Sequence, residues 1–74
     1  MEVRIMRVRV NKSNREEMER FVIDGLDAVA RLRKGFVSII DMWNIEVAVE
    51  RKFNVSDPAS QKLVAAVIQG HKND

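Results

Sequence analysis

The pattern over residues 13–35 most constrains the fold, because it indicates one long amphipathic helix with a signal at each end. Ser13 stands three residues before Glu16, the spacing of a capping box, in which each side chain bonds an orphan backbone N–H. Gly35 follows a basic run and can adopt the left-handed backbone that ends many helices. Apolar or small residues recur at helical spacing between these ends: Met18, Phe21, Val22, Gly25, Val29 and Leu32. The rest of the chain must cover this apolar stripe.

Residues 2–10 predict a strand from their β-branched content and their near-alternation of apolar and charged side chains. The alternation slips once, so a bulge near Met6 would bring three arginines together on the face away from the core. These arginines are Arg4, Arg7 and Arg9. Without a bulge, they are divided between the two faces of the strand.

Residues 36–52 favour a β-hairpin. Large apolar side chains crowd residues 36–41, and apolar and polar side chains alternate over residues 44–52. A short turn led by an aspartate is typical chemistry for joining two antiparallel strands. Met42 and Trp43 would then form the tip of the hairpin.

A single helix over residues 36–52 is the competing interpretation. A set of apolar residues falls at helical spacing there: Phe36, Ile40, Trp43 and Val47. The dense β-branched content of the segment favours the hairpin instead.

A second helix is predicted to begin at Ser56-Asp57-Pro58, because serine or aspartate is a good N-cap and proline is favoured in the first turn. Its narrow apolar stripe consists of Leu63, Val64, Val67 and Ile68. Gly70 can end this helix, which leaves residues 71–74 as a frayed polar tail.

The expected order is strand, helix, hairpin, helix over a single domain of residues 1–74. Both apolar stripes are covered if the two helices lie on one face of a three-stranded sheet. This is an α+β two-layer sandwich, β-α-β-β-α, with spatial strand order 1-3-2 and the first strand at an open edge. The layout resembles that of the DinI-type modulators of the bacterial recombinase. Their terminal helix is markedly acidic, whereas residues 58–70 here contain Lys62 and no acidic residue, so their activity is not carried over.

The size of the chain favours self-association. A domain of 74 residues buries only about 60 % of its unfolded surface. The chain has no cysteine for disulfides, and its single histidine, His71, cannot build a multi-histidine metal site. Oligomerisation is the remaining means of stabilisation, so we expect a homodimer. A monomer is the alternative, since domains of this size also fold alone.

The composition predicts a cytoplasmic protein without a membrane segment. The lack of cysteine fits a reducing compartment, and the charged and apolar residues that alternate at the start are no signal peptide. The apolar runs are far shorter than the roughly 20 residues of a membrane helix. A formal net charge of +2 describes a mixed surface, not the strongly basic one of a dedicated nucleic-acid binder.

The residues offer little for catalysis, so we expect no enzyme, no cofactor and no metal. His71 falls in the predicted tail, and the chain has no glycine-rich phosphate loop and no metal-ligand spacing. We expect a small interaction or regulatory module that binds a protein partner or itself. Met42 and Trp43 are the candidate contact residues, because an exposed tryptophan is a frequent interface anchor. Alternatively, Trp43 folds back over the helix end as part of the core.

The alternative function is nucleic-acid binding by the arginine-rich sheet face of Arg4, Arg7 and Arg9, which could follow a phosphate backbone. Equally, these arginines could pair across the sheet with Glu46 and Glu50.

Overall fold

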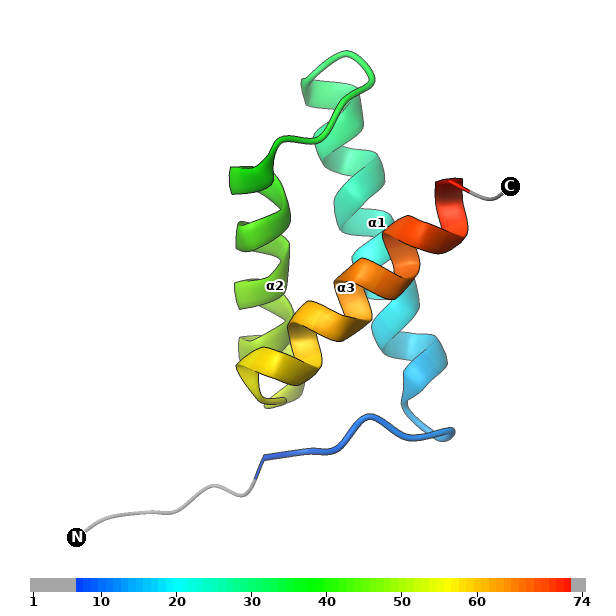
Figure 1. Ribbon diagram of the computed structural model, residues 1–74, viewed down its shortest axis with the longest axis vertical. Coiled ribbons are helices and arrows are strands. Elements are labelled where there is room, and N and C mark those ends of the chain that lie inside the picture. Colours follow the sequence, from blue (N-terminus) through cyan, green and yellow to red (C-terminus); the bar gives the residue numbers. More distant parts are fainter. Residues whose placement is uncertain (1–6, 73–74) are drawn as a thin grey trace, which may run out of the picture.

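The structure, a computed structural model, describes residues 7–72, with side chains through residue 70, and folds them into three helices. α1 spans Arg15–Leu32, α2 spans Ile39–Phe53 and α3 spans Asp57–Lys72. α1 and α2 run antiparallel, and α3 crosses both of them (Figure 1). Each helix contacts the other two, so the molecule is a three-helix bundle.

The expected α+β sandwich is wrong, because residues 7–72 contain helices and no strand. The decisive difference lies in residues 36–52, where the competing helical interpretation is close to the observed structure. Ser38 is the N-cap of α2: its Oγ accepts a hydrogen bond from the Asp41 N–H at 3.2 Å, and the Asp41 Oδ2 accepts one from the Ser38 N–H at 3.1 Å. Asp41, which favoured a hairpin turn in the sequence, is therefore the third residue of α2 and the partner of Ser38 in a capping box.

Packing outweighs the β-branched composition of α2. Helix propensities of ordinary residues differ by at most about 0.7 kcal/mol. Burial of a whole valine or isoleucine side chain contributes about 1.5 to 3 kcal/mol. Ile45 and Val49 lie one helical turn apart and are both buried in the core. Their burial as a helical pair explains why α2 forms despite its composition.

The predicted first strand is replaced, over residues 7–10, by a segment that crosses the α2–α3 turn (Figure 1). The Val8 N–H donates to the carbonyl of Asn54 at 2.7 Å, and the Arg7 guanidinium donates to the carbonyl of Val55 at 3.2 Å. Residues 2–6 of that strand, with Arg4, lie outside the described residues. The strand order 1-3-2 and the open strand edge are therefore wrong, and the resemblance to DinI-type modulators, which rested on that layout, goes with them.

The start of α1 lies near its predicted position but has a different cap. Asn14 is the N-cap residue, and its side chain bonds back to the Asn11 N–H at 2.9 Å and to the Arg9 carbonyl at 2.9 Å. The Ser13 hydroxyl donates to the Asn11 Oδ1 at 2.6 Å. Ser13 is thus engaged in an asparagine turn, and the predicted capping box with Glu16 is wrong.

The end of α1 has the left-handed backbone that was predicted, shifted by one residue. The Gly35 N–H donates to the Ala30 carbonyl at 2.7 Å, which is the 6→1 bond of a Schellman motif. Lys34, with φ 58°, occupies the left-handed C′ position, and Gly35 follows with φ 102°. This turn directs the chain away from α1 and into the connection to α2.

The predicted start of α3 is confirmed. The helix begins at Asp57, and the Ser56 Oγ accepts a hydrogen bond from the Ala59 N–H at 3.3 Å. The predicted end is wrong, because the helix continues through Gly70 to Lys72. Residues 73–74 lie outside the described part of the chain.

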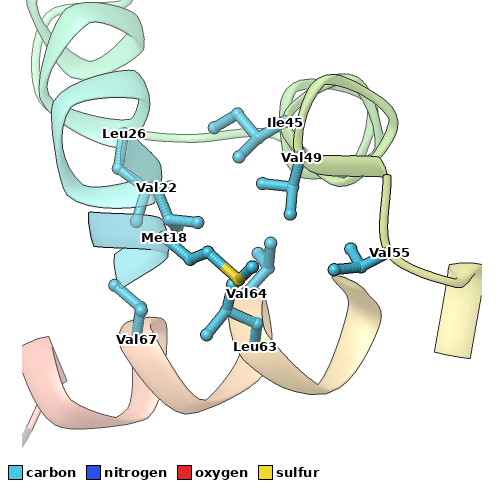
Figure 2. Close-up of a cluster of buried hydrophobic side chains, with 9 residues drawn as sticks. All are labelled: Met18, Val22, Leu26, Ile45, Val49, Val55, Leu63, Val64 and Val67. Atoms are coloured by element: carbon cyan, nitrogen blue, oxygen red, sulfur yellow. The ribbon is translucent and has the colours of Figure 1, made fainter. Parts of the chain in front are cut away.

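Apolar side chains from the three helices and from the α2–α3 turn meet in one core (Figure 2). The buried set is Met18, Val22, Leu26, Ile45, Val49, Val55, Leu63, Val64 and Val67. Met18 and Val22 belong to the predicted stripe of α1, whereas Leu32 at the end of that stripe is 84 % exposed. The core thus covers most of the α1 stripe but not its C-terminal end.

Gly25 marks a close approach between α1 and α2. A Cβ atom added at Gly25 would lie 3.5 Å from Cγ1 of Ile45, an ordinary van der Waals distance. The position therefore has room for one methyl group and for little more.

We expect Gly25→Ala to raise the free energy of unfolding by about 0.5 to 1 kcal/mol, because alanine favours a helix interior over glycine. Gly25→Leu should lower it by about 1 to 3 kcal/mol, because the larger side chain must displace Ile45. Urea unfolding followed by circular dichroism measures both changes. A destabilising alanine would mean that α1 and α2 approach each other more closely than described.

Candidate functional site

Large apolar side chains gather on the surface where α1 ends and α2 begins. They are Leu32, Phe36, Ile39, Ile40 and Trp43, and each is between 61 % and 84 % exposed. We call this set the apolar patch. It falls within a dozen consecutive residues at the end of the molecule that contains the α1–α2 connection, while α3 crosses α1 and α2 further from that connection (Figure 1).

The patch exists because α2 has two apolar faces and the bundle covers one of them. Trp43 and Ile45 are two residues apart, which places them about 200° apart around the helix axis. Ile45 is buried against the other helices, and Trp43 therefore points away from the core. Of the helical spacing noted above, Ile40, Trp43 and Val47 belong to this outer face, whereas Phe36 lies in the connection before the Ser38 cap.

The amount of exposed apolar surface is large for a chain of this size. With about 150 to 250 Å² for each large side chain, the observed exposed fractions leave on the order of 700 Å² of apolar patch in water. The largest apolar patch on a typical monomer covers about 300 to 600 Å² and is often functional. The apolar patch is therefore the strongest candidate for a functional surface.

The backbone beneath the patch is held by polar contacts that centre on Asp41. Besides the capping box with Ser38, the Asp41 Oδ1 accepts a bond from the Arg33 guanidinium at 3.2 Å, which joins the end of α1 to the start of α2. Hydrogen bonds from the side chain and backbone of Ser38, together with the Arg33 charge, hold the pKa of Asp41 below its ordinary value of 3.8. The patch is thus displayed on a preorganised connection.

Charged residues flank the apolar patch at its two ends. Arg31, Arg33 and Lys34 are exposed at the end of α1. Glu46 and Glu50 are partly exposed further along α2, and Arg51 and Lys52 are exposed beside them. Partial burial, and then the neighbouring carboxylate of Asp57, raise the pKa of Glu50. The α1 end of the patch is therefore basic, whereas the far end carries charges of both signs.

The structure separates the two predicted contact residues. Trp43 is 63 % exposed, so the alternative that placed it in the core is wrong. Met42 is partly buried and lines an open cavity of about 490 Å³ between α1, the α1–α2 connection and α3. The other lining residues are Leu26, Asp27, Ala30, Gly35, Val37 and Ile68. A role of either residue in binding stays a prediction.

The arginine-rich sheet face is wrong as a structure, because the described residues contain no sheet. Arg4 lies outside residues 7–72, and Arg7 and Arg9 are exposed on the segment before α1. In place of the predicted cross-strand pairs, the charge of Arg7 attracts the Glu50 carboxylate and opposes the rise in the pKa of Glu50. Contact between these arginines and phosphates stays a prediction, without the sheet that motivated it.

Sequence reasoning named Trp43 but missed the other four members of the patch. The hairpin interpretation places Phe36, Ile39 and Ile40 in a strand, and the predicted stripe of the first helix includes Leu32. The signal that could have found two of them, Phe36 and Ile40, is the competing helical spacing over residues 36–52. A helix with apolar residues on two opposite faces either is buried all round or carries an interaction surface.

Residues 7–72 contain no cluster of three or more His, Cys, Asp or Glu side chains that could hold a metal ion. Within the same residues, no helix is both long enough and apolar enough to cross a bilayer. Comparisons with protein-family models, with curated proteins and with solved structures returned no significant match.

The junction at Asp41 predicts a pH dependence of stability. The folded-state pKa of Asp41 lies below the unfolded one, so its stabilisation is complete above the unfolded pKa and is lost as the pH falls through the folded pKa. Asp41→Asn should flatten the decline in unfolding free energy on acidification below about pH 4. Asp24→Asn is the matched control, because Asp24 is exposed on α1 and away from this junction. Denaturant titrations between pH 6 and pH 2.5 measure the effect, and an unchanged decline in Asp41→Asn would contradict it.

Proposed function

We propose that the chain is a non-enzymatic interaction module that binds a protein partner through the apolar patch. The observation that carries this proposal is the exposure of Leu32, Phe36, Ile39, Ile40 and Trp43 on one end of the bundle. Exposed apolar area of this size promotes association or aggregation unless a partner covers it. We place the module in the cytoplasm, as expected from the absence of cysteine.

The composition of the patch suits protein recognition. Tryptophan is the residue type most enriched among those that dominate binding energy, and Trp43 lies between the isoleucines and the later part of α2. The basic residues at one end and the glutamates at the other would form the polar rim that surrounds the apolar centre of an interface. A helix face of this kind pairs with another amphipathic helix or with an apolar groove.

The preorganised connection supports the same proposal. The Arg33–Asp41 contact and the Ser38 cap fix the start of α2, which carries three of the five patch residues. A surface that is ordered before binding loses less conformational entropy on association than a flexible loop does. No observation in residues 7–72 favours nucleic-acid binding to a comparable degree.

We expect a photo-crosslinking residue at Ile39 to capture a protein partner in cells of the native host, identified by mass spectrometry of the adduct. The same residue at Gln61, which is exposed on α3, is the control and should capture little. Trp43→Ala in the Ile39-labelled chain should lower the yield by about tenfold or more, as expected when a central tryptophan anchor costs about 2 kcal/mol.

Equal capture from Ile39 and Gln61, or a yield that is insensitive to Trp43→Ala, would contradict the proposed function. Lys62→Ala serves as a second control, because Lys62 is exposed on α3. Its yield should match that of the unsubstituted chain.

A further inference from the structure

We infer that the partner on the apolar patch is a second copy of this chain, with α2 of one copy packed antiparallel on α2 of the other. This inference rests on the proposed function and gives it a partner and a geometry. Three observations lead to it: the symmetry of the outer stripe, the placement of charge along it, and the exposed area.

The outer face of α2, which carries Ile39, Trp43 and Val47, is self-complementary about Trp43. Ile39 precedes Trp43 by four residues and Val47 follows it by four, so each lies about 6 Å from Trp43 along the helix axis. A two-fold axis at Trp43 would bring Ile39 and Ile40 of one copy opposite Val47 and Glu46 of the other, and Trp43 against its own counterpart. Interfaces of this isologous kind close on themselves and end at a dimer.

Charge selects the antiparallel arrangement. Glu50 follows Trp43 by seven residues, which is two helical turns, so it lies on the same side of α2 as Trp43. The basic group of Arg31, Arg33 and Lys34 lies at the opposite end of the stripe. Arg33 is already paired with Asp41, which leaves Arg31 and Lys34 at that end.

At the other end of the stripe, Lys52 lies over the Phe21 and Phe53 rings, and Glu46, Glu50 and Arg51 (two negative charges and one positive) leave a net negative charge. An antiparallel pair brings the basic end of each copy to this end of the other, whereas a parallel pair would place like charges together.

The area is sufficient for a stable pair. A standard interface buries about 800 Å² on each partner. The whole apolar patch exposes on the order of 700 Å²; Ile39, Ile40 and Trp43 contribute to it from α2 itself, and the flanking charged residues add to the interface. A dimer would also stabilise the small core of a 74-residue chain, because it doubles the number of helices that bury apolar surface together.

The first experiment measures the mass of the full chain by size-exclusion chromatography with light scattering, from about 2 to 200 μM. We expect a concentration-dependent rise from 8.5 kDa to twice that mass. The emission of Trp43, which is the sole tryptophan, should shift to shorter wavelength over the same range as the indole leaves water. Ile39→Asp and Trp43→Asp should remain at monomer mass, and Gln61→Asp on α3 should dimerise like the unsubstituted chain.

The second experiment tests the antiparallel register by charge reversal. Lys34→Glu and Glu50→Lys should each weaken dimerisation several-fold, because each places like charges across the interface. The double variant should recover most of the loss, because it restores opposite charges with their positions exchanged. Circular dichroism confirms that each variant remains helical. Additive losses in the double variant would overturn the antiparallel register.

The outcomes separate this inference from the proposed function. A chain that stays monomeric at 200 μM, or a dimer that survives Ile39→Asp and Trp43→Asp, overturns the inference. If that monomer still captures another protein from Ile39, the proposed function stands with a different partner. If instead it co-sediments with phosphatidylglycerol vesicles through Trp43 and captures no protein, a membrane surface is the target and both proposals fail.

Discussion

The carboxylate of Asp41 joins the end of α1 to the start of α2, and the arrangement of the surface depends on this junction. One oxygen accepts the Ser38 N–H and hydroxyl, and the other accepts the Arg33 guanidinium. These bonds fix where α2 begins and how it is joined to α1, and packing against α1 and α3 then decides which side of the helix faces the core. With this packing, Ile45 and Val49 face inward and Trp43 faces outward. A hairpin would not have separated these residues between a buried side and an exposed side.

A bundle of three helices can cover only part of the apolar surface that this chain carries. α2 is apolar on two opposite sides, and α1 and α3 together occupy one of them. Within residues 7–72, the outer side of α2 is left uncovered, so the exposed apolar patch follows from packing only one of the two apolar sides against α1 and α3.

The candidate site was partly visible in the sequence. Trp43 stands out in the sequence because an indole at the expected hairpin tip beside Met42 would be partly exposed; the hairpin is wrong, but the structure does place Trp43 on the surface. The predicted arginine face is wrong, because it depended on a strand that residues 7–10 do not form. Local alternation of arginine and valine is equally compatible with an irregular segment held by the Val8 and Arg7 contacts to the α2–α3 turn. Periodicity alone does not distinguish these cases when the segment is short.

The sequence by itself determined α1 to within a few residues and the start of α3, because amphipathic periodicity, caps and glycine act within one or two helical turns. It also determined that residues 36–52 are strongly apolar. Only the tertiary structure decided that these residues form a helix and which of its two stripes is buried. That choice depends on contacts with Met18, Val22 and α3, which lie far away in the chain. Hydrophobic burial is not directional. An apolar segment with both helical and strand periodicity therefore forms the helix or strand whose apolar side its distant neighbours can cover.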